Sequence, residues 1–235
     1  MSGMIGDPLI TVDHVACRYK VRHGRMRFKS YVALRDVSLV IHRGETIGLI
    51  GRNGAGKSTL LHLVSGIILP DGGKVVFHEP ASVSLLSLQL GFSPDLSGRD
   101  NAIIGAMLLG YSKRESIARL DAITAFAELE DWIDEPLRTY SSGMRARLGF
   151  AVAMEMSPDV LLIDETLGVG DESFRKKSTE AMKEKLKSGQ TTVFVSHSLL
   201  DVQELCSRVV WIDNGRVKMI GVPGEVIPAY CDHVR

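Results

Sequence analysis

A glycine-rich segment that ends in lysine and serine is the part of the sequence best suited to chemistry. Residues 51–58 read Gly-Arg-Asn-Gly-Ala-Gly-Lys-Ser, which fits the phosphate-loop pattern G-x-x-x-x-G-K-[ST] without a mismatch. Glycines allow backbone N–H groups to surround a β-phosphate, Lys57 can reach the β- and γ-phosphates, and Ser58 can offer its hydroxyl to Mg²⁺. A chance glycine-rich turn is the alternative interpretation. The predicted nucleotide contacts are Gly51, Asn53, Gly54, Ala55, Gly56, Lys57, Ser58 and Thr59.

Two acidic residues come at the end of an apolar run, 160–163, which predicts a strand. Because side chains alternate along a strand, Asp164 and Glu165 face different ways and can have different roles. Asp164 is the predicted Mg²⁺ ligand, and Glu165 is predicted to polarise the attacking water. Such a pair can also serve only as the cap of a following helix. Its place downstream of a phosphate loop favours the catalytic interpretation.

A histidine follows a second apolar run, 192–195. In a parallel sheet His197 would lie at the same edge as the phosphate loop and Glu165. From there it could bind the γ-phosphate or the attacking water. A lone histidine is more often a structural residue, so the role of His197 depends on the other motifs.

Strands and helices alternate around these motifs, which predicts an α/β fold with a parallel sheet. The strand at 46–50 enters the phosphate loop directly, and a helix is expected to follow it at 58–64. Asn214-Gly215 between two apolar runs is a strong hairpin signal. Further strands are predicted at 9–15, 37–41, 75–77, 209–212 and 217–220, and helices at 117–126 and 174–186.

Charge balance, cysteine spacing and the lack of long apolar runs exclude some classes of protein. Lys+Arg and Asp+Glu both number 28, which argues against a nucleic-acid binder. The cysteines Cys17, Cys206 and Cys231 lack metal-ligand spacing and fit a reducing compartment. We find no signal-peptide pattern and no run of apolar residues long enough for a membrane span, so a membrane process would need a second chain. The basic segment 20–29 is either a solvated hairpin face or a contact for phospholipid head groups or an anionic substrate.

The segment 140–145, Tyr-Ser-Ser-Gly-Met-Arg, resembles the signature motif of ABC ATPases. Together with the phosphate loop, the acids that end the strand, Asp171 and His197, it stands in the order and spacing of that family. The resemblance covers nearly the whole chain. It implies a single ABC ATPase domain over 1–235, with a P-loop NTPase core, an antiparallel β subdomain and a helical subdomain at about 95–155.

The resemblance also implies ATP and Mg²⁺ as cofactors and a homodimer as the working form. Ser142 and Gly143 would begin a helix whose N-terminal amides face the γ-phosphate held by the opposite subunit. Asp171 matches the loop that crosses between subunits. Tyr19 stands where the family stacks an aromatic ring on adenine, and simple packing is the alternative for this residue.

One position departs from the family pattern, since Ser93 stands where a glutamine usually contacts Mg²⁺ and the membrane subunit. We therefore expect the loop to couple to the membrane partner without a glutamine contact to the metal.

In detail the motifs resemble the ATPases that export polysaccharides such as O-antigen, capsule or teichoic acid. This resemblance implies a separate permease dimer that handles the glycan, and a position at the cytoplasmic face of the inner membrane. The alternatives are an ABC ATPase for another transported substrate, a soluble one that acts on nucleic acid or ribosomes, or a regulatory nucleotide switch.

Overall fold

The computed structural model describes residues 6–23, 27–86, 91–164 and 171–234, with side chains left out at 21–29. The chain divides into two compact units. The first contains Met1–Leu85, Val160–Glu165 and Leu186–Arg235, and the second contains Leu86–Asp159 and Thr166–Lys185. Each unit has a buried hydrophobic cluster of its own. Glu165 lies outside the described residues, so its predicted role has no structural counterpart here.

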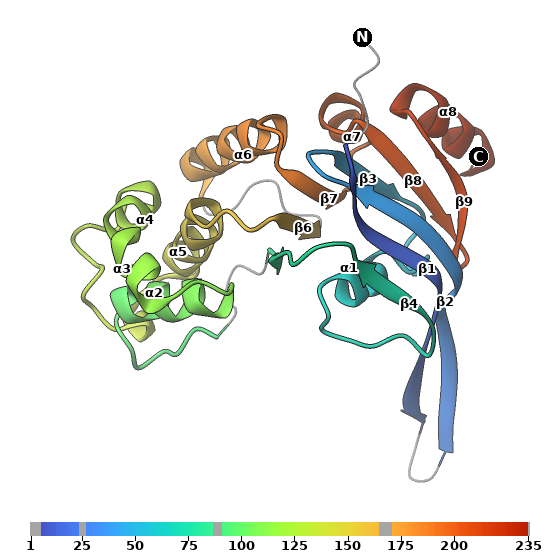
Figure 1. The fold of residues 1–235 in the computed structure, drawn as a ribbon. Helices are drawn as coiled ribbons and strands as arrows, with labels where there is room; N and C mark the ends of the chain where they lie inside the picture. Colours follow the sequence, from blue (N-terminus) through green and yellow to red (C-terminus); the bar gives the residue numbers. More distant parts are fainter. Residues whose placement is uncertain (1–5, 24–26, 87–90, 165–170, 235) are drawn as a thin grey trace. The chain divides into compact units, whose positions relative to one another are not determined.

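The first unit is built on a nine-stranded sheet with the order β4-β1-β2-β9-β8-β3-β7-β6-β5 (Figure 1). The strands at its centre are parallel: β3 pairs with β7 and β8, and β6 pairs with β5 and β7. Strands β1, β2 and β4 pair antiparallel. The α/β class and the antiparallel β portion predicted from the sequence are confirmed. The strands are β1 (Pro8–His23), β2 (Arg27–His42), β3 (Thr46–Ile50), β4 (Gly72–Phe77), β5 (Val83–Leu85), β6 (Val160–Asp164), β7 (Thr191–Val195), β8 (Arg208–Asp213) and β9 (Arg216–Gly221).

Among its described residues, three helices belong entirely to this unit: α1 (Lys57–Val64), α7 (Leu199–Leu205) and α8 (Pro223–Val234). All five residues of β3 are buried, and Leu60 and Leu61 of α1 are buried in the same cluster. The hairpin predicted at Asn214-Gly215 joins β8 and β9, and both residues adopt positive φ angles, as a tight hairpin turn requires.

Strands β1 and β2 form a hairpin that is longer than the sequence predicts. Each has 16 residues, and they pair from Pro8↔His42 to His23↔Arg27. Strand β4 accompanies β1 only as far as Ala16↔Gly72, so within the described part of the chain the outer strands of the hairpin pair only with each other (Figure 1). The basic residues of 20–29 interrupt the apolar alternation, which is why periodicity underestimates these strands.

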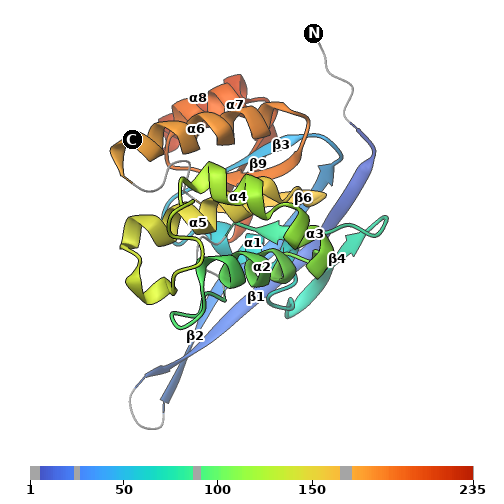
Figure 2. The same cartoon turned by 90° about the vertical axis from the view of Figure 1, so that its left-hand side faces the viewer.

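The second unit is helical, as predicted for the middle of the chain (Figure 2). Serine side chains cap α2, α3 and α5: Ser97, Ser112 and Ser141 each accept a bond from a backbone amide three residues ahead. Buried Ala102, Ile123 and Leu148 belong to its core. The helices are α2 (Gly98–Leu108), α3 (Lys113–Ala118), α4 (Leu120–Ala127), α5 (Ser142–Glu155) and α6 (Glu172–Lys187), the last of which continues into the first unit at its end. Among the described residues, we find no helix that combines the length and the apolar character of a membrane span.

Candidate nucleotide-binding site

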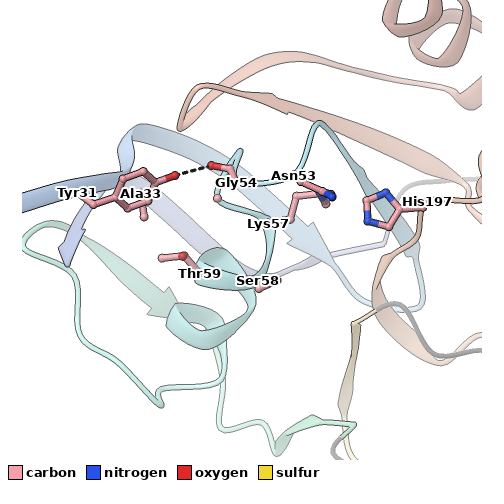
Figure 3. A pocket seen from close by; sticks show the side chains of 9 residues that line it. Tyr31, Ala33, Asn53, Gly54, Lys57, Ser58, Thr59 and His197 are labelled. Atoms are coloured by element: carbon pink, nitrogen blue, oxygen red, sulfur yellow. Dashed lines mark hydrogen bonds between the residues drawn. The ribbon is translucent and has the colours of Figure 1, made fainter. Parts of the chain in front are cut away.

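A cavity of about 280 Å³ lies over the phosphate loop and the start of α1, within the first unit. The loop leaves buried β3 at its carboxyl end, which is where open α/β sheets bind ligands. Most of the predicted phosphate contacts therefore line one cavity. The lining residues are Tyr31, Ala33, Asn53, Gly54, Gly56, Lys57, Ser58, Thr59 and His197 (Figure 3).

Lys57 brings a positive charge into this cavity. Its side chain is only 6% exposed, and Nζ donates to the carbonyl oxygens of Gly51 at 2.9 Å and Arg52 at 3.2 Å. A buried ammonium is stable only when such acceptors surround it. The loop thus holds its lysine where a phosphate anion can replace or share these acceptors.

The turn between β8 and β9 supports the loop from another part of the sequence. Gly215 N donates to Ala55 O at 3.1 Å, and Arg35 N donates to Gly215 O at 2.8 Å. This chain of backbone bonds joins β2, the hairpin turn and the phosphate loop. The loop is therefore held in shape by tertiary contacts as well as by its own glycines.

Gly54 and Gly56 of the loop both need left-handed backbone, and of these two only Gly54 has room for a side chain. Gly54 has φ +78°, and a Cβ there would meet only Tyr31 Oη, at 3.5 Å. Gly56 has φ +108°, and a Cβ there would lie 2.5 Å from Leu34 Cδ2 and 2.6 Å from Ala33 O. Gly56 is thus required both by its backbone angle and by close packing against β2.

His197 follows β7, the strand that pairs with β3 in parallel from Thr46↔Thr192 to Leu49↔Val195. The structure places it in the cavity lining, at the opposite end from Tyr31 and close to Lys57 and Asn53 (Figure 3). Its ring is exposed, so it is accessible to a ligand.

Asp164 is the last residue of β6, paired with Val195 of β7. Its Oδ1 atom is buried and has no hydrogen-bond partner among the described residues. A buried carboxylate oxygen without a donor suits a cation, because burial of an unpaired charge is otherwise unfavourable. The described residues contain no cluster of three or more His, Cys, Asp or Glu side chains able to hold a metal. Mg²⁺ suits this arrangement, since it is commonly held by one or two protein ligands together with phosphates and water.

Tyr31 is a lining residue that the sequence analysis missed. Its hydroxyl donates to Gly54 O at 2.8 Å (Figure 3). It pairs in register with Tyr19, whose hydroxyl donates to Thr59 Oγ1 at 3.4 Å. Tyr31 therefore contacts the phosphate loop, and Tyr19 contacts the first turn of α1 directly after it. In the sequence, Tyr31 could have been found only as the residue opposite Tyr19 across a hairpin. That assignment requires the length of the hairpin to be known.

In the second unit, Ser142 is the first residue of α5 and Gly143 is the second. Ser141 caps the helix by accepting from Met144 N at 3.1 Å, which leaves Ser142 exposed at the N-terminus. The predicted helix start at the signature segment is thus present. The partial positive charge of a helix N-terminus favours an anionic ligand there.

Asp171 precedes α6 and acts as its cap. Oδ1 accepts from Phe174 N at 3.0 Å and from Ser173 Oγ at 2.8 Å, and Oδ2 accepts from the Arg147 guanidinium. The Phe174 amide, followed by the Ser173 hydroxyl and Arg147, lowers the pKa of the Asp171 carboxyl to about 2. Asp171 is therefore an anion throughout the physiological pH range.

Ser93 lies in a loop that is organised by Asn101 of α2. The Asn101 side chain is fully buried, and its Oδ1 accepts from Ser93 N at 2.7 Å. Its Nδ2 lies 3.0, 3.1 and 2.8 Å from the carbonyl oxygens of Ser93, Leu96 and Ser97. One side chain thus fixes the backbone of residues 93–97.

A family model for the ABC transporter matches residues 34–168. The chain belongs to the ABC transporter family. It is 47% identical over 205 residues to the O-antigen export system ATP-binding protein RfbB of Klebsiella pneumoniae, a match that covers 87% of this chain and 83% of that protein. It is 43% identical over 202 residues to the teichoic acids export ATP-binding protein TagH of Lactococcus lactis, covering 86% of this chain but only 43% of that longer protein.

The fold is also that of solved ABC cassettes. A dimeric ATP-binding cassette in a post-hydrolysis state, bound to ADP and Pi, aligns with a TM-score of 0.72 at 22% identity. The alignment covers 92% of this chain and 99% of that one. The family and fold predicted from the sequence are confirmed, and the chain is an ABC-type ATPase.

Proposed function

We propose that this chain is the ATP-hydrolysing subunit of an ABC transporter that exports a cell-surface polysaccharide through a separate membrane permease. The main support is the 47% identity to an O-antigen export ATP-binding protein over most of both chains. The teichoic acid export relative supports the same broad class of cargo. The glycan is handled mainly by the permease, and the ATPase binds at the cytoplasmic face of the membrane.

The cavity residues have different roles in binding ATP. The phosphate loop, from Gly51 to Thr59, surrounds the phosphates, and Lys57 neutralises charge on the β- and γ-phosphates. Ser58 and Asp164 would hold Mg²⁺, which would neutralise charge that develops during phosphoryl transfer. An aromatic ring of the first hairpin, Tyr19 or the neighbouring Tyr31, stacks on adenine. Support for this division comes from the buried ammonium of Lys57 and the unpartnered oxygen of Asp164.

Hydrolysis needs a group that orients water and a group that contacts the γ-phosphate. We assign the first role to Glu165 and the second to His197, which lines the cavity. Two copies of the single cassette, each with a helical subdomain near residues 95–155, form the working unit. Ser142, Gly143 and Asp171 of one copy complete the site of the other.

The hydrolysis step is tested by Glu165→Gln, which keeps the side-chain volume and removes the carboxylate. We expect this variant to bind ATP, to accumulate as an ATP-bound dimer on size exclusion, and to lose turnover. Lys57→Met is the matched control, because it removes phosphate binding and leaves the protein monomeric in ATP. Full turnover by Glu165→Gln would refute the role assigned to Glu165.

The transport assignment is tested by co-purification from detergent-solubilised membranes of the source cells. An integral membrane protein eluting with stimulated ATP hydrolysis, together with loss of surface glycan when Glu165→Gln replaces the native chain, would support export. A dimer that elutes with nucleic acid or ribosomes would refute transport while leaving the ATPase assignment intact.

A further inference from the structure

Arg147 connects three helices of the second unit. It lies on α5, five residues after Ser142, or about 7.5 Å along the helix axis. Its guanidinium donates to Asp171 before α6, and its NH1 lies 3.4 Å from Oε2 of Glu128 at the end of α4. The same group lies over the ring of Phe174, 5.2 Å from the ring centroid. One side chain thus binds two carboxylates and an aromatic face.

The surroundings hold the guanidinium in one orientation. Phe126, Phe150 and Phe174 form a cluster with ring centroids 5.9 to 6.3 Å apart. On α6, Lys177 Nζ lies 2.8 Å from Oε1 of Glu128 and 5.0 Å from the centroid of the Phe126 ring. The Arg147 side chain is only 18% exposed, whereas that of Asp171 is 53% exposed, so the guanidinium is mostly covered and its carboxylate partner stays open to solvent. The planar guanidinium has several N–H donors that can reach these partners at once, whereas a lysine ammonium is a single point charge.

Stability alone is a poor explanation for this arginine. Its Nε is buried and has no hydrogen-bond partner among the described residues. Partly buried ion pairs often contribute little net stability, and an unsatisfied donor reduces it further. What the arrangement does achieve is a fixed connection between the helix that begins at Ser142 and the segment that leads into α6 through Asp171.

We propose that Arg147 is a positioning residue that fixes Asp171 to the signature helix. The inference rests on the proposed function, in which both elements face the nucleotide of the opposite subunit. If they form one rigid piece, the helix N-terminus and Asp171 reach that nucleotide in a single geometry. Without Arg147, each subunit would still bind ATP, but the ATP-bound dimer would form less readily.

The test measures ATP-dependent dimerisation in the Glu165→Gln background by analytical ultracentrifugation, with ATP affinity of the monomer measured separately. Arg147→Lys and Asp171→Asn should each raise the dimer dissociation constant by about tenfold. The double variant should have a dissociation constant no higher than that of either single variant, because two residues that act through one contact have non-additive effects. Monomer affinity for ATP and the urea midpoint should stay at the parent values. Glu128→Gln is the matched control, because it weakens the same network but leaves the contact between Arg147 and Asp171 in place, and it should dimerise as the parent does.

Parent-like dimerisation of Arg147→Lys would overturn the proposal, as would additive effects in the double variant. A loss of dimer that follows the urea midpoint and occurs equally in Glu128→Gln would show a purely structural role and would overturn it too. These outcomes leave the proposed function standing, since the Glu165→Gln parent still dimerises in ATP. Failure of the parent itself to dimerise would overturn both.

Discussion

Gly56 offers a test of how closely the phosphate loop is packed, because the same loop contains its own control. Gly54→Ala and Gly56→Ala both place a methyl group on a residue with positive φ. That conformation costs an L-residue roughly 1–2 kcal/mol, partly offset by about 0.4–1 kcal/mol from the lower entropy of the unfolded chain. These two contributions are common to both variants and largely cancel when the variants are compared.

The difference between the variants comes from the space around each Cβ. At Gly54 the nearest atom would be 3.5 Å away, which is an ordinary contact. At Gly56 the methyl group would lie 2.6 Å from Ala33 O, a backbone atom of β2 that cannot move alone. Overpacking of this kind costs about 1–3 kcal/mol. We therefore expect Gly56→Ala to be less stable than Gly54→Ala by about 1–3 kcal/mol.

The assay is urea unfolding without nucleotide, followed by tryptophan fluorescence. The chain has two tryptophans, so a Trp132→Phe background leaves Trp211, which is buried in the first unit and reports on the sheet that carries the loop. Equal free energies of unfolding for the two alanine variants would refute the reasoning. That result would mean that strand β2 adjusts freely to the added methyl group.

Three further predictions concern other parts of the molecule. If the Tyr31 ring stacks on the base, Tyr31→Ala should weaken ATP binding about 5- to 100-fold in isothermal titration calorimetry. Tyr31→Phe keeps the ring and should retain the affinity for ATP. Wild-type affinity in Tyr31→Ala would exclude the ring from the site. Asn101→Ala removes the hydrogen-bond partner of several buried backbone groups, so it should reduce the free energy of unfolding by about 2–4 kcal/mol. It should also speed hydrogen exchange at the amide of Ser93. An unchanged exchange rate would contradict this reasoning. Burial lowers the pKa of Lys185 to about 8, from 10.5 in the unfolded chain. Between these two values the folded state has lost the proton while the unfolded state still holds it. The free energy of unfolding should therefore rise by on the order of 1 to 3 kcal/mol as the pH increases from about 8 to 10.5. This gain should be absent in Lys185→Met when urea unfolding is compared at the two ends of that range, and an equal gain in the variant would assign the effect to other groups.

The family and the central strands follow from local sequence because they depend on local chemistry. The pattern from Gly51 to Ser58 predicts a loop between a strand and a helix, and the structure has β3 end at Ile50 and α1 begin at Lys57. Asn214-Gly215 predicts its hairpin because two consecutive residues with positive φ favour this pair. Neither prediction requires knowledge of distant residues.

The tertiary structure decided which distant residues share the cavity. Tyr31 and the phosphate loop are brought together by the register of a hairpin whose two strands have 16 residues each, and local periodicity does not reveal that register. The contact between Arg147 and Asp171 joins residues 24 positions apart through the packing of α5 against the start of α6. The sequence states which groups can carry out phosphate chemistry. Which neighbours hold those groups depends on long-range packing, because the energy of such contacts exists only once the elements have assembled.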